Sequence, residues 1–411
     1  MDIAVVGGGA AGFFAAVTAA EAAPGLRVVV LEKGPRVLAK VRISGGGRCN
    51  VTHACFDPRE LAAFYPRGGR ELVGAFHHWG PRETVAWFAA RGVELKTEAD
   101  GRMFPVTDES RTITDCLEAA ARGAGVEVRT GCGVESLRRT PEGFGLATPA
   151  GAWEARRVLL AHGGPRAGDG LAAGLGHAVV PPAPSLFSFQ IRDPLLEGLA
   201  GISLAEAEAA IPACGERRRG GLVVAHDGLS GPAVLRLSAW AARWIQEAGG
   251  NFEVVLDWLP ETGRDAVAAR LREVREAWAR KELGTVSPFP SLPQRLWARL
   301  AGPGRWAGLP NARLAELSAR LKATPFCVTG KRMNKDEFVT AGGVPLKEMD
   351  LRRMESRICP GLHVAGEALD VDGVTGGFNF QAAWTSGRLA GLAMAEGARL
   401  DPRRGCGWMA G

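Results

Sequence analysis

The fold is decided by residues 2–12, Asp2-Ile3-Ala4-Val5-Val6-Gly7-Gly8-Gly9-Ala10-Ala11-Gly12, and by residues 26–32, Leu26-Arg27-Val28-Val29-Val30-Leu31-Glu32. Residues 2–6 and 26–31 predict two short buried strands, because both runs are apolar and rich in β-branched side chains. The Ala-rich residues 10–23 between them predict a helix that ends at Pro24-Gly25. The three elements form a βαβ unit, whose crossover we expect to be right-handed.

The turn between the first strand and the helix matches the pattern Gly-x-Gly-x-x-Gly. With 56 glycines in 411 residues the pattern alone is weak, but its place between a strand and a helix is typical of a dinucleotide site. Gly7 allows the tight turn, and Gly12 lets helix and strand pack closely. Gly9 lets the backbone N–H groups of Ala10 and Ala11 approach a pyrophosphate at the positive end of the helix. The alternative is a Gly-rich turn without a ligand.

The acidic residue expected at the end of the second strand is Glu32, 20 residues after Gly12. Its carboxylate is predicted to accept hydrogen bonds from the ribose hydroxyls of the adenosine, with Lys33 beside it.

The other end of the chain distinguishes FAD from NAD. Residues 360–367 predict a turn, a strand and then Gly366-Glu367, which we expect at the ribityl chain. The turn Gly376-Gly377 precedes a helix that continues to about residue 396, and it aims the helix N-terminus at the pyrimidine edge of a flavin. The first helical residues Asn379, Phe380 and Gln381 are predicted to line the same site. For Glu367 and Asp370 the alternative is a solvated loop position.

Residues 33–57 predict a long Gly-rich loop, and loops of this length inside a compact domain are usually functional or disordered. It contains Lys40 and the run Ser44-Gly45-Gly46-Gly47-Arg48-Cys49-Asn50, in which three glycines let backbone approach a flat ligand. Lys40 and Arg48 are expected to offset phosphate charge. Cys49 and Arg48 are the candidate catalytic residues, with Cys49 as a thiol proton donor; the alternative for Cys49 is a small packed hydrophobe. A disulfide-reductase site is not predicted, because Cys49 and Cys55 lack the required spacing.

The fold class predicted is α/β: a Rossmann-like FAD-binding domain of the glutathione-reductase-like ββα kind, with a second domain inserted. The first domain is expected over residues 1–185 and 326–411. The insertion, residues 186–325, begins with short strand-like pieces and has helical patterns near 263–283, 292–300 and 311–321. It is therefore predicted to combine a β-barrel-like part with helices.

Further stretches resemble the signatures of one family, in the same order along the chain. These are residues 44–52, Gly101-Arg102-Met103-Phe104-Pro105, Gly228-Leu229-Ser230-Gly231-Pro232, Thr340-Ala341-Gly342-Gly343-Val344 and residues 361–391. The chain resembles the bacterial NAD(P)/FAD-dependent oxidoreductases of the BaiN/RdsA, or aminoacetone-oxidase-like, type. The resemblance places residues 40–52 along the pyrophosphate and the isoalloxazine, and Val134, Ala161 and Gly163 at the cofactor. One departure is a short turn from Ala161 to Asp169-Gly170.

The family implies a flavin reductase fed by NAD(P)H as a transient reductant. Because only one dinucleotide fold is predicted, NAD(P)H and substrate would use the same flavin face in turn. The leading substrate is an electron-poor C=C, with uracil in ribosomal RNA preferred. A steroid enone, an amine oxidised by O2, and a non-enzymatic flavin-binding role are the alternatives.

The net charge of +6 comes from 50 basic and 44 acidic residues, and most of the basic ones are arginine. Codon bias and an anionic partner such as RNA both explain it. In the inserted domain Arg217-Arg218-Arg219 is a candidate phosphate contact, with a solvated hairpin tip as the alternative.

No apolar run is long enough for a membrane span, and the scattered cysteines favour a reduced, cytoplasmic protein without a metal site. The oligomeric state stays open.

Overall fold

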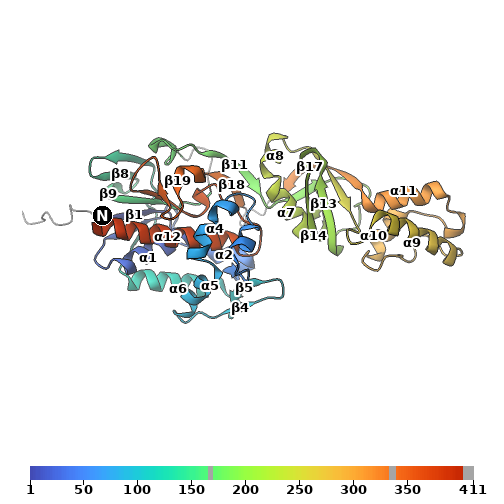
Figure 1. The fold of residues 1–411 in the computed structure, drawn as a ribbon, viewed down its shortest axis with the longest axis horizontal. Coiled ribbons are helices and arrows are strands. Elements are labelled where there is room, and N and C mark those ends of the chain that lie inside the picture. The colour runs from blue at the N-terminus through green and yellow to red at the C-terminus, as the bar shows by residue number, and fades with distance from the viewer. Residues whose placement is uncertain (165–169, 333–338, 401–411) are drawn as a thin grey trace, which may run out of the picture. The chain divides into compact units, whose positions relative to one another are not determined.

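The computed structural model describes residues 1–164, 170–332 and 339–400, and the chain divides into two compact units (Figure 1). The first unit is Met1–Ala183 with Val339–Gly411, and the second is Pro184–Phe338. The predicted return to the first domain at residue 326 falls inside strand β17 (Thr324–Arg332). This strand pairs with β12 (Ser188–Ile191) and β16 (Phe252–Asp257), so it belongs to the second unit.

The first unit is built on a seven-stranded sheet in the order β19-β20-β21-β10-β1-β2-β6. Five strands run parallel: β1 (Ile3–Val6), β2 (Val28–Leu31), β6 (Glu127–Arg129), β10 (Arg157–Leu160) and β21 (Leu362–Val364). The antiparallel edge is β19 (Met349–Asp350) and β20 (Glu355–Ser356). Strands β1 and β2 are buried along their whole length, as their continuous apolar runs require. The predicted Rossmann-like α/β fold is confirmed.

Two helices from opposite ends of the chain pack together in this unit. Helix α1 (Ala10–Ala22) is almost wholly buried, and α12 (Phe378–Leu400) lies along it (Figure 1). Their contact is lined by Gly387 and Gly391, where an added Cβ would come within 2.6 Å of the carbonyl oxygens of Ala11 and Ala15. The absence of side chains at these two positions therefore allows the close approach of the helices.

The segment 33–57, predicted as one loop, contains helix α2 (Ala39–Gly47) and strand β3 (Thr52–His53). The loop prediction was wrong at α2 because buried Val41 anchors a helical turn, while Leu38 begins it in the left-handed region. Helical geometry ends at Ser44, so the glycines after it still form an irregular turn.

The first unit also contains further helices and two small antiparallel sheets. These helices are α3 (Pro58–Ala62), α4 (Gly69–His78), α5 (Pro81–Ala89) and α6 (Ser110–Gly123). Two small antiparallel sheets have the orders β3-β5-β4 and β7-β8-β9. Their other strands are β4 (Leu95–Thr97), β5 (Arg102–Pro105), β7 (Ser136–Thr140), β8 (Gly143–Thr148) and β9 (Gly151–Ala155). Strand β11 (Val180–Ser185) pairs with β18 (Val339–Gly343).

The second unit is a closed six-stranded barrel with helices, as predicted. Its strands follow the order β12-β15-β14-β13-β16-β17, with β13 (Ser203–Ile211), β14 (Glu216–Ala225) and β15 (Gly228–Ser230). The helices are α7 (Pro232–Trp240), α8 (Ala242–Glu247), α9 (Arg264–Ala277), α10 (Gln294–Ala301) and α11 (Asn311–Lys322). Barrel and helices share one hydrophobic core, which includes Trp258, Trp297 and Trp306. None of the helices in the described residues is both long and apolar enough to cross a membrane.

Candidate functional site

The three glycines of the first turn do different things. At Gly7, which has φ +108°, an added Cβ would lie 2.5 Å from the Ala161 carbonyl oxygen, so the turn touches the end of β10. At Gly12 an added Cβ would lie 2.0 Å from the Gly7 carbonyl oxygen, so helix and turn are in contact. At Gly9, by contrast, a Cβ would meet nothing within 4 Å. Gly9 precedes α1 and supplies no side-chain cap, and open space lies beside it. The N–H groups at the start of such a helix, here those of Ala10 and Ala11, are the donors that an anionic ligand would use.

Glu32 stands where the sequence places it, and it also holds the turn together. Its Oε2 accepts the N–H of Gly8 at 2.7 Å, and its Oε1 accepts the N–H of Gly34 at 2.6 Å. Each carboxylate oxygen retains a second lone pair that can accept from a ribose hydroxyl. The Glu32 carboxylate therefore holds the backbone at Gly8 and Gly34, on the side of the site predicted for adenosine.

Lys33 and Val134 lie near each other at the ends of β2 and β6. The N–H of Cys132 donates to the Glu32 carbonyl oxygen at 2.8 Å, and an added Cβ at Gly133 would lie 2.8 Å from the Lys33 Cγ. Val134 follows directly and is half-buried. The structure thus brings this connection to the predicted adenosine side.

The C-terminal half-site meets the N-terminal one directly. Gly366 has φ +65°, and a Cβ there would lie 2.9 Å from the Ala11 Cβ on α1. Its N–H donates to Ser386 Oγ of α12 at 2.9 Å. The adjacent Glu367 forms an ion pair with Lys40 of α2, with Nζ and Oε2 2.7 Å apart. A Cβ at Gly163 would lie 3.9 Å from the same Oε2. The predicted turn from Gly163 onward continues into residues 165–169, which lie outside the described residues.

The three glycines after α2 adopt left-handed conformations, with φ of +58° at Gly45, +68° at Gly46 and +86° at Gly47. A Cβ at Gly46 or Gly47 would meet nothing within 4 Å, whereas one at Gly45 would lie 3.2 Å from the Phe104 ring. Ser44 ends the helical turn by donating its hydroxyl to the Val41 carbonyl oxygen at 2.8 Å. Glycine is needed here for its backbone conformation, and open space lies beside two of the three residues.

The segment that follows is fastened to the start of α12. Asn50, with its amide oriented to satisfy both groups, accepts the N–H of Gly377 at 3.0 Å. Trp384 Nε1 donates to the Val51 carbonyl oxygen at 2.9 Å. Thr52 Oγ1 donates to Gln381 Oε1 at 2.6 Å, and both side chains are buried. Asn50, Gly377 and Gln381, all predicted at the cofactor, therefore join the two half-sites.

Other predicted residues of this half-site shape the turn before α12. At Gly377 a Cβ would lie 2.5 Å from the Thr52 carbonyl oxygen, so no other residue fits there, and Gly376 has φ +125°. Asn379 accepts the N–H of Gly373 and donates to its carbonyl oxygen, both at 2.8 Å. Phe380 stacks on Trp384 with ring centroids 5.7 Å apart.

The candidate proton donor Cys49 is buried, and so is Tyr65. Cys49 is fully buried, and burial raises the pKa of its thiol to about 12. This environment favours the packing interpretation over the proton-donor one. Tyr65, the only tyrosine of the chain, donates its hydroxyl to the Phe378 carbonyl oxygen at 2.6 Å, and burial raises its pKa well above the ordinary value. Its hydroxyl is committed to the turn that begins α12.

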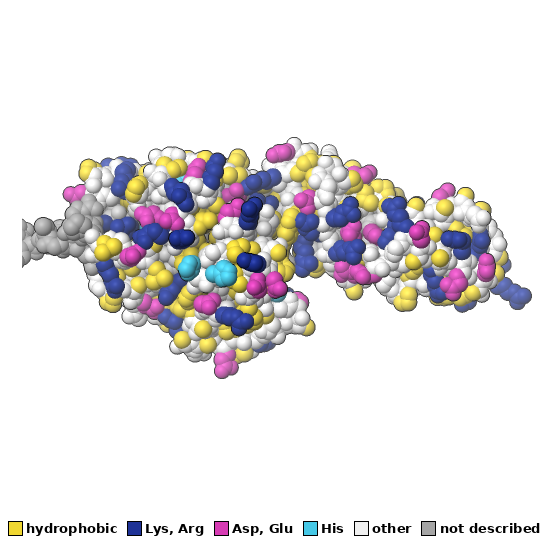
Figure 2. All heavy atoms as spheres, in the orientation of Figure 1, with side chains coloured by type: hydrophobic (Ala, Val, Ile, Leu, Met, Phe, Trp, Pro, Cys, Tyr) yellow, Lys and Arg dark blue, Asp and Glu magenta, His cyan; other side chains and the backbone are white. Residues whose placement is uncertain are grey.

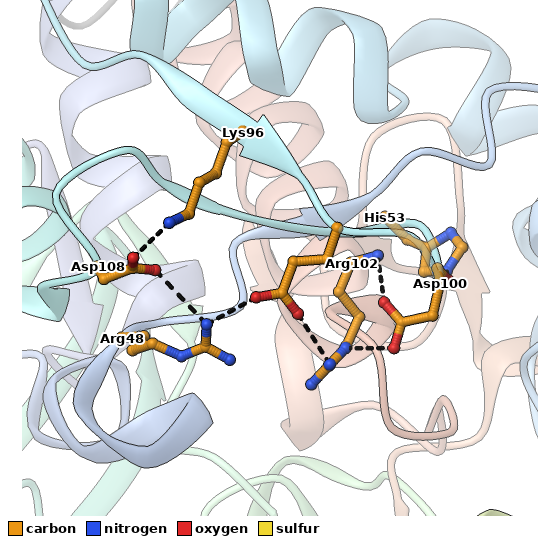
Figure 3. A network of polar contacts seen from close by, with 7 residues as sticks. Arg48, His53, Lys96, Asp100, Arg102 and Asp108 are labelled. Atoms are coloured by element: carbon orange, nitrogen blue, oxygen red, sulfur yellow. Dashed lines mark hydrogen bonds and ion pairs between the residues drawn. The ribbon is translucent and has the colours of Figure 1, made fainter.

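Arg48 contacts carboxylates and an aromatic ring. Its Nη1 lies 2.7 Å from Glu98 Oε1 and 3.5 Å from Asp108 Oδ1 (Figure 3). Its guanidinium lies 4.0 Å from the centre of the Phe104 ring. The bond to Glu98 is the main cause that raises the pKa of Arg48. Arg48 thus belongs to an ion-pair network on the small sheet β3-β5-β4, and its contact with a phosphate stays a prediction.

The sequence prediction missed a buried ion pair beside the site. Arg67, on the connection before α4, forms a two-bond pair with the fully buried Asp372, and the two residues also form an isolated β-bridge. Phe378 stacks on Phe64 and on His53, with ring centroids 4.4 and 4.7 Å apart, and the rings of His53 and Phe64 also lie 5.9 Å from each other. The partners are about 300 residues apart in sequence, so no local signal could have paired them.

The arginines at the predicted RNA contact are paired with acids. Arg217 and Arg219 lie 3.8 and 2.9 Å from Glu208, and Arg218 lies 3.0 Å from Glu216. On the visible face of the second unit, basic and acidic side chains are interspersed (Figure 2). This arrangement favours the solvated-hairpin interpretation over a dedicated phosphate site.

Two of the family signatures have packing roles. At Gly228 a Cβ would lie 2.1 Å from the Phe189 carbonyl oxygen, so the glycine lets β15 approach β12 in the barrel. At Gly342 and Gly343 a Cβ would lie 2.7 Å from the Pro181 and 2.6 Å from the Ala368 carbonyl oxygen. These positions therefore support the barrel and the turn beside Glu367.

The residues fit FAD. A Cβ-free surface with open space occurs at Gly9 and at Gly46-Gly47, and the start of α1 supplies N–H donors. The start of α12 is aligned by its bonds to residues 50–52. A pyrophosphate at the first place and a flat ring at the second require this combination.

A family model agrees with this description. The model of the HI0933-like protein Rossmann domain matches residues 1–393. Two relatives are 30% identical to this chain. One is the 3-dehydro-bile acid delta(4,6)-reductase of Clostridium scindens, with 96% of this chain and 99% of the relative covered. The other is the ribosomal RNA dihydrouridine synthase of Escherichia coli, with 94% and 96% covered.

Solved structures share the fold. The 3-ketosteroid delta1-dehydrogenase of Sterolibacterium denitrificans has a TM-score of 0.52 at 12% identity, with 96% of this chain and 99% of that chain covered. The quinol fumarate reductase of E. coli has a TM-score of 0.50 at 18% identity, with 99% and 71% covered. At these identities the likeness shows the fold alone.

Proposed function

The chain belongs to the HI0933-like family and is an FAD-dependent oxidoreductase, and we propose that it reduces an electron-poor C=C, with uracil in ribosomal RNA as the leading substrate. The observation that carries the proposal is the direct junction of two half-sites. Gly7 contacts Ala161, Gly366 contacts Ala11, and Lys40 pairs with Glu367. A ligand that spans both the start of α1 and the start of α12 must be a long one, as FAD is.

The residues of the chain bind and orient this ligand. When bound, FAD supplies two-electron transfer between a reductant and the substrate. The start of α1 offsets the pyrophosphate charge, and Glu32 holds the turn that presents it. The start of α12 places the positive end of a helix at the ring, where negative charge is stabilised.

NAD(P)H is proposed as a transient reductant. The relatives' names describe reductive chemistry, and the described residues contain a single Rossmann sheet, that of β1, β2, β6, β10 and β21. Reductant and substrate would then occupy the same face in turn, so we expect ping-pong kinetics under anaerobic conditions.

The substrate is proposed from the names of the relatives. A dihydrouridine synthase and a bile-acid delta(4,6)-reductase both saturate a double bond, so a C=C reductase accommodates both. The equal identity to the two relatives makes a steroid enone the second candidate. Uracil reduction needs a proton for C5, and the buried Cys49 with its raised pKa is a poor donor for it.

The deciding experiment is mass spectrometry of ribosomal RNA from a strain that lacks this gene. The proposal predicts that a dihydrouridine is lost and that it returns when the gene is supplied again. Unchanged RNA together with anaerobic reduction of a steroid enone by the purified protein would transfer the assignment to the second candidate. Peroxide release from small amines would instead support an amine oxidase.

A further inference from the structure

Two arginines share one carboxylate beside the tri-glycine turn. Glu98 Oε1 lies 2.7 Å from Arg48 Nη1, and Glu98 Oε2 lies 2.8 Å from Arg102 Nη2 (Figure 3). Arg48 comes from the end of α2, whereas Glu98 and Arg102 come from the β4–β5 hairpin. Glu98 therefore joins two elements and balances two positive charges.

The network is bonded at both of its ends. Asp108 accepts from Arg48 at 3.5 Å and from Lys96, and Asp100 accepts from Arg102 Nε at 2.7 Å. His53 Nε2 lies 3.0 Å from the Asp100 carbonyl oxygen. Three basic side chains thus face three carboxylates, so their formal charges balance.

The network lies next to the candidate ring site. Arg48 directly follows Gly47, beside which there is open space, and its guanidinium packs on the Phe104 ring. Phe104 in turn supports Gly45, since a Cβ there would lie 3.2 Å from the ring. Arg102 lies over the same ring at 5.4 Å. Removal of one charge from this group would change the potential at Gly46 and Gly47.

We propose that Glu98 is a positioning and electrostatic residue of the flavin site, which balances Arg48 and Arg102 and thereby sets the reduction potential of the bound flavin. The inference rests on the proposed function, because it requires FAD beside the tri-glycine turn. Reduced flavin carries negative charge at the ring, so extra positive charge nearby stabilises it. Loss of the Glu98 charge should raise the potential, and loss of the Arg102 charge should lower it.

The test compares Glu98→Gln, Arg102→Gln and the double variant with wild type. Reduction potential is measured by spectroelectrochemistry on the FAD-loaded protein, and FAD affinity by fluorescence titration of the apo-protein. We expect a higher reduction potential for Glu98→Gln, a lower one for Arg102→Gln, and a value near that of wild type for the double variant. FAD affinity should change by about two- to fivefold in the same directions, as expected for partly exposed charges.

The control is Asp115→Asn, which breaks the exposed Arg111–Asp115 pair on α6 and should change neither quantity. If Glu98→Gln does not fold, Asp108→Asn is measured in its place, because this change also removes a negative charge that is paired with Arg48. Equal potentials in all variants, or shifts of one sign in both single variants, would overturn the inference while FAD binding still stands. Absence of FAD binding by wild type would instead overturn the proposed function.

Discussion

Replacement of Gly9 by valine should weaken FAD binding without unfolding the protein. Gly9 has φ −87° and ψ −168°, an extended conformation that valine adopts readily, and a Cβ there meets nothing within 4 Å. The loss of a glycine before α1 should cost about 1 kcal/mol of stability or less. In the complex the valine would occupy the place of the pyrophosphate, and such overpacking costs about 1–3 kcal/mol, or roughly 5- to 150-fold in affinity.

Gly12→Ala is the matched comparison, because its Cβ would lie 2.0 Å from the Gly7 carbonyl oxygen. It should destabilise the apo-protein itself, by about 1–3 kcal/mol. The assay is urea unfolding of both apo-variants, together with fluorescence titration by FAD. If Gly9→Val binds FAD as wild type does, the pyrophosphate does not lie over Gly9. If it unfolds as readily as Gly12→Ala, the space beside Gly9 is not open. Either result would refute the reasoning.

Glu32→Ala should lower both the unfolding free energy and FAD affinity, by about 1–3 kcal/mol each, because it removes two backbone hydrogen bonds from the turn; an affinity loss with unchanged urea midpoint would contradict this. His363 is fully buried, and burial lowers its pKa from 6.5 to about 4, against the opposing influence of Glu355. The unfolded state therefore takes up the proton first, so stability should fall as pH drops from about 6.5 to 4, by at most about 1.4 kcal/mol per pH unit. Urea unfolding at several pH values should show a flatter profile for His363→Gln, and an identical profile would refute the assignment. Neutralisation of Arg217, Arg218 and Arg219 to Gln should leave RNA binding and its salt dependence unchanged, since acids already pair with them; a weaker salt dependence in a filter-binding assay would restore the phosphate-contact hypothesis.

Local sequence predicted the βαβ unit and the helix at the C-terminal end. Continuous apolar runs and glycine spacing act within a few residues, so Gly7, Gly9 and Gly12 could be given separate roles before the structure was known. The direction of Arg48 could not be predicted in the same way. Its partners Glu98 and Asp108 lie 50 and 60 residues further along the chain, on another element.

The basic composition illustrates the same limit. Many arginines of the second unit donate to backbone carbonyl oxygens of loops and helix ends: Arg270 to Pro288, Arg275 to Leu309, Arg295 to Gly198, Arg299 to Pro194, Arg313 to Ala301 and Arg320 to Leu300. These side chains supply donors to carbonyl oxygens of the same unit. A net charge counted from the sequence could not distinguish this internal use from the binding of an anionic partner.

The most direct test of the account is identification of the cofactor that the purified protein releases on heat denaturation. Two joined half-sites at the starts of α1 and α12 predict a yellow protein that releases FAD without covalent linkage, with a single FAD per chain after reconstitution. Chromatography and mass spectrometry of the supernatant separate FAD from FMN. Release of FMN, or no flavin bound after reconstitution, would contradict the central claim.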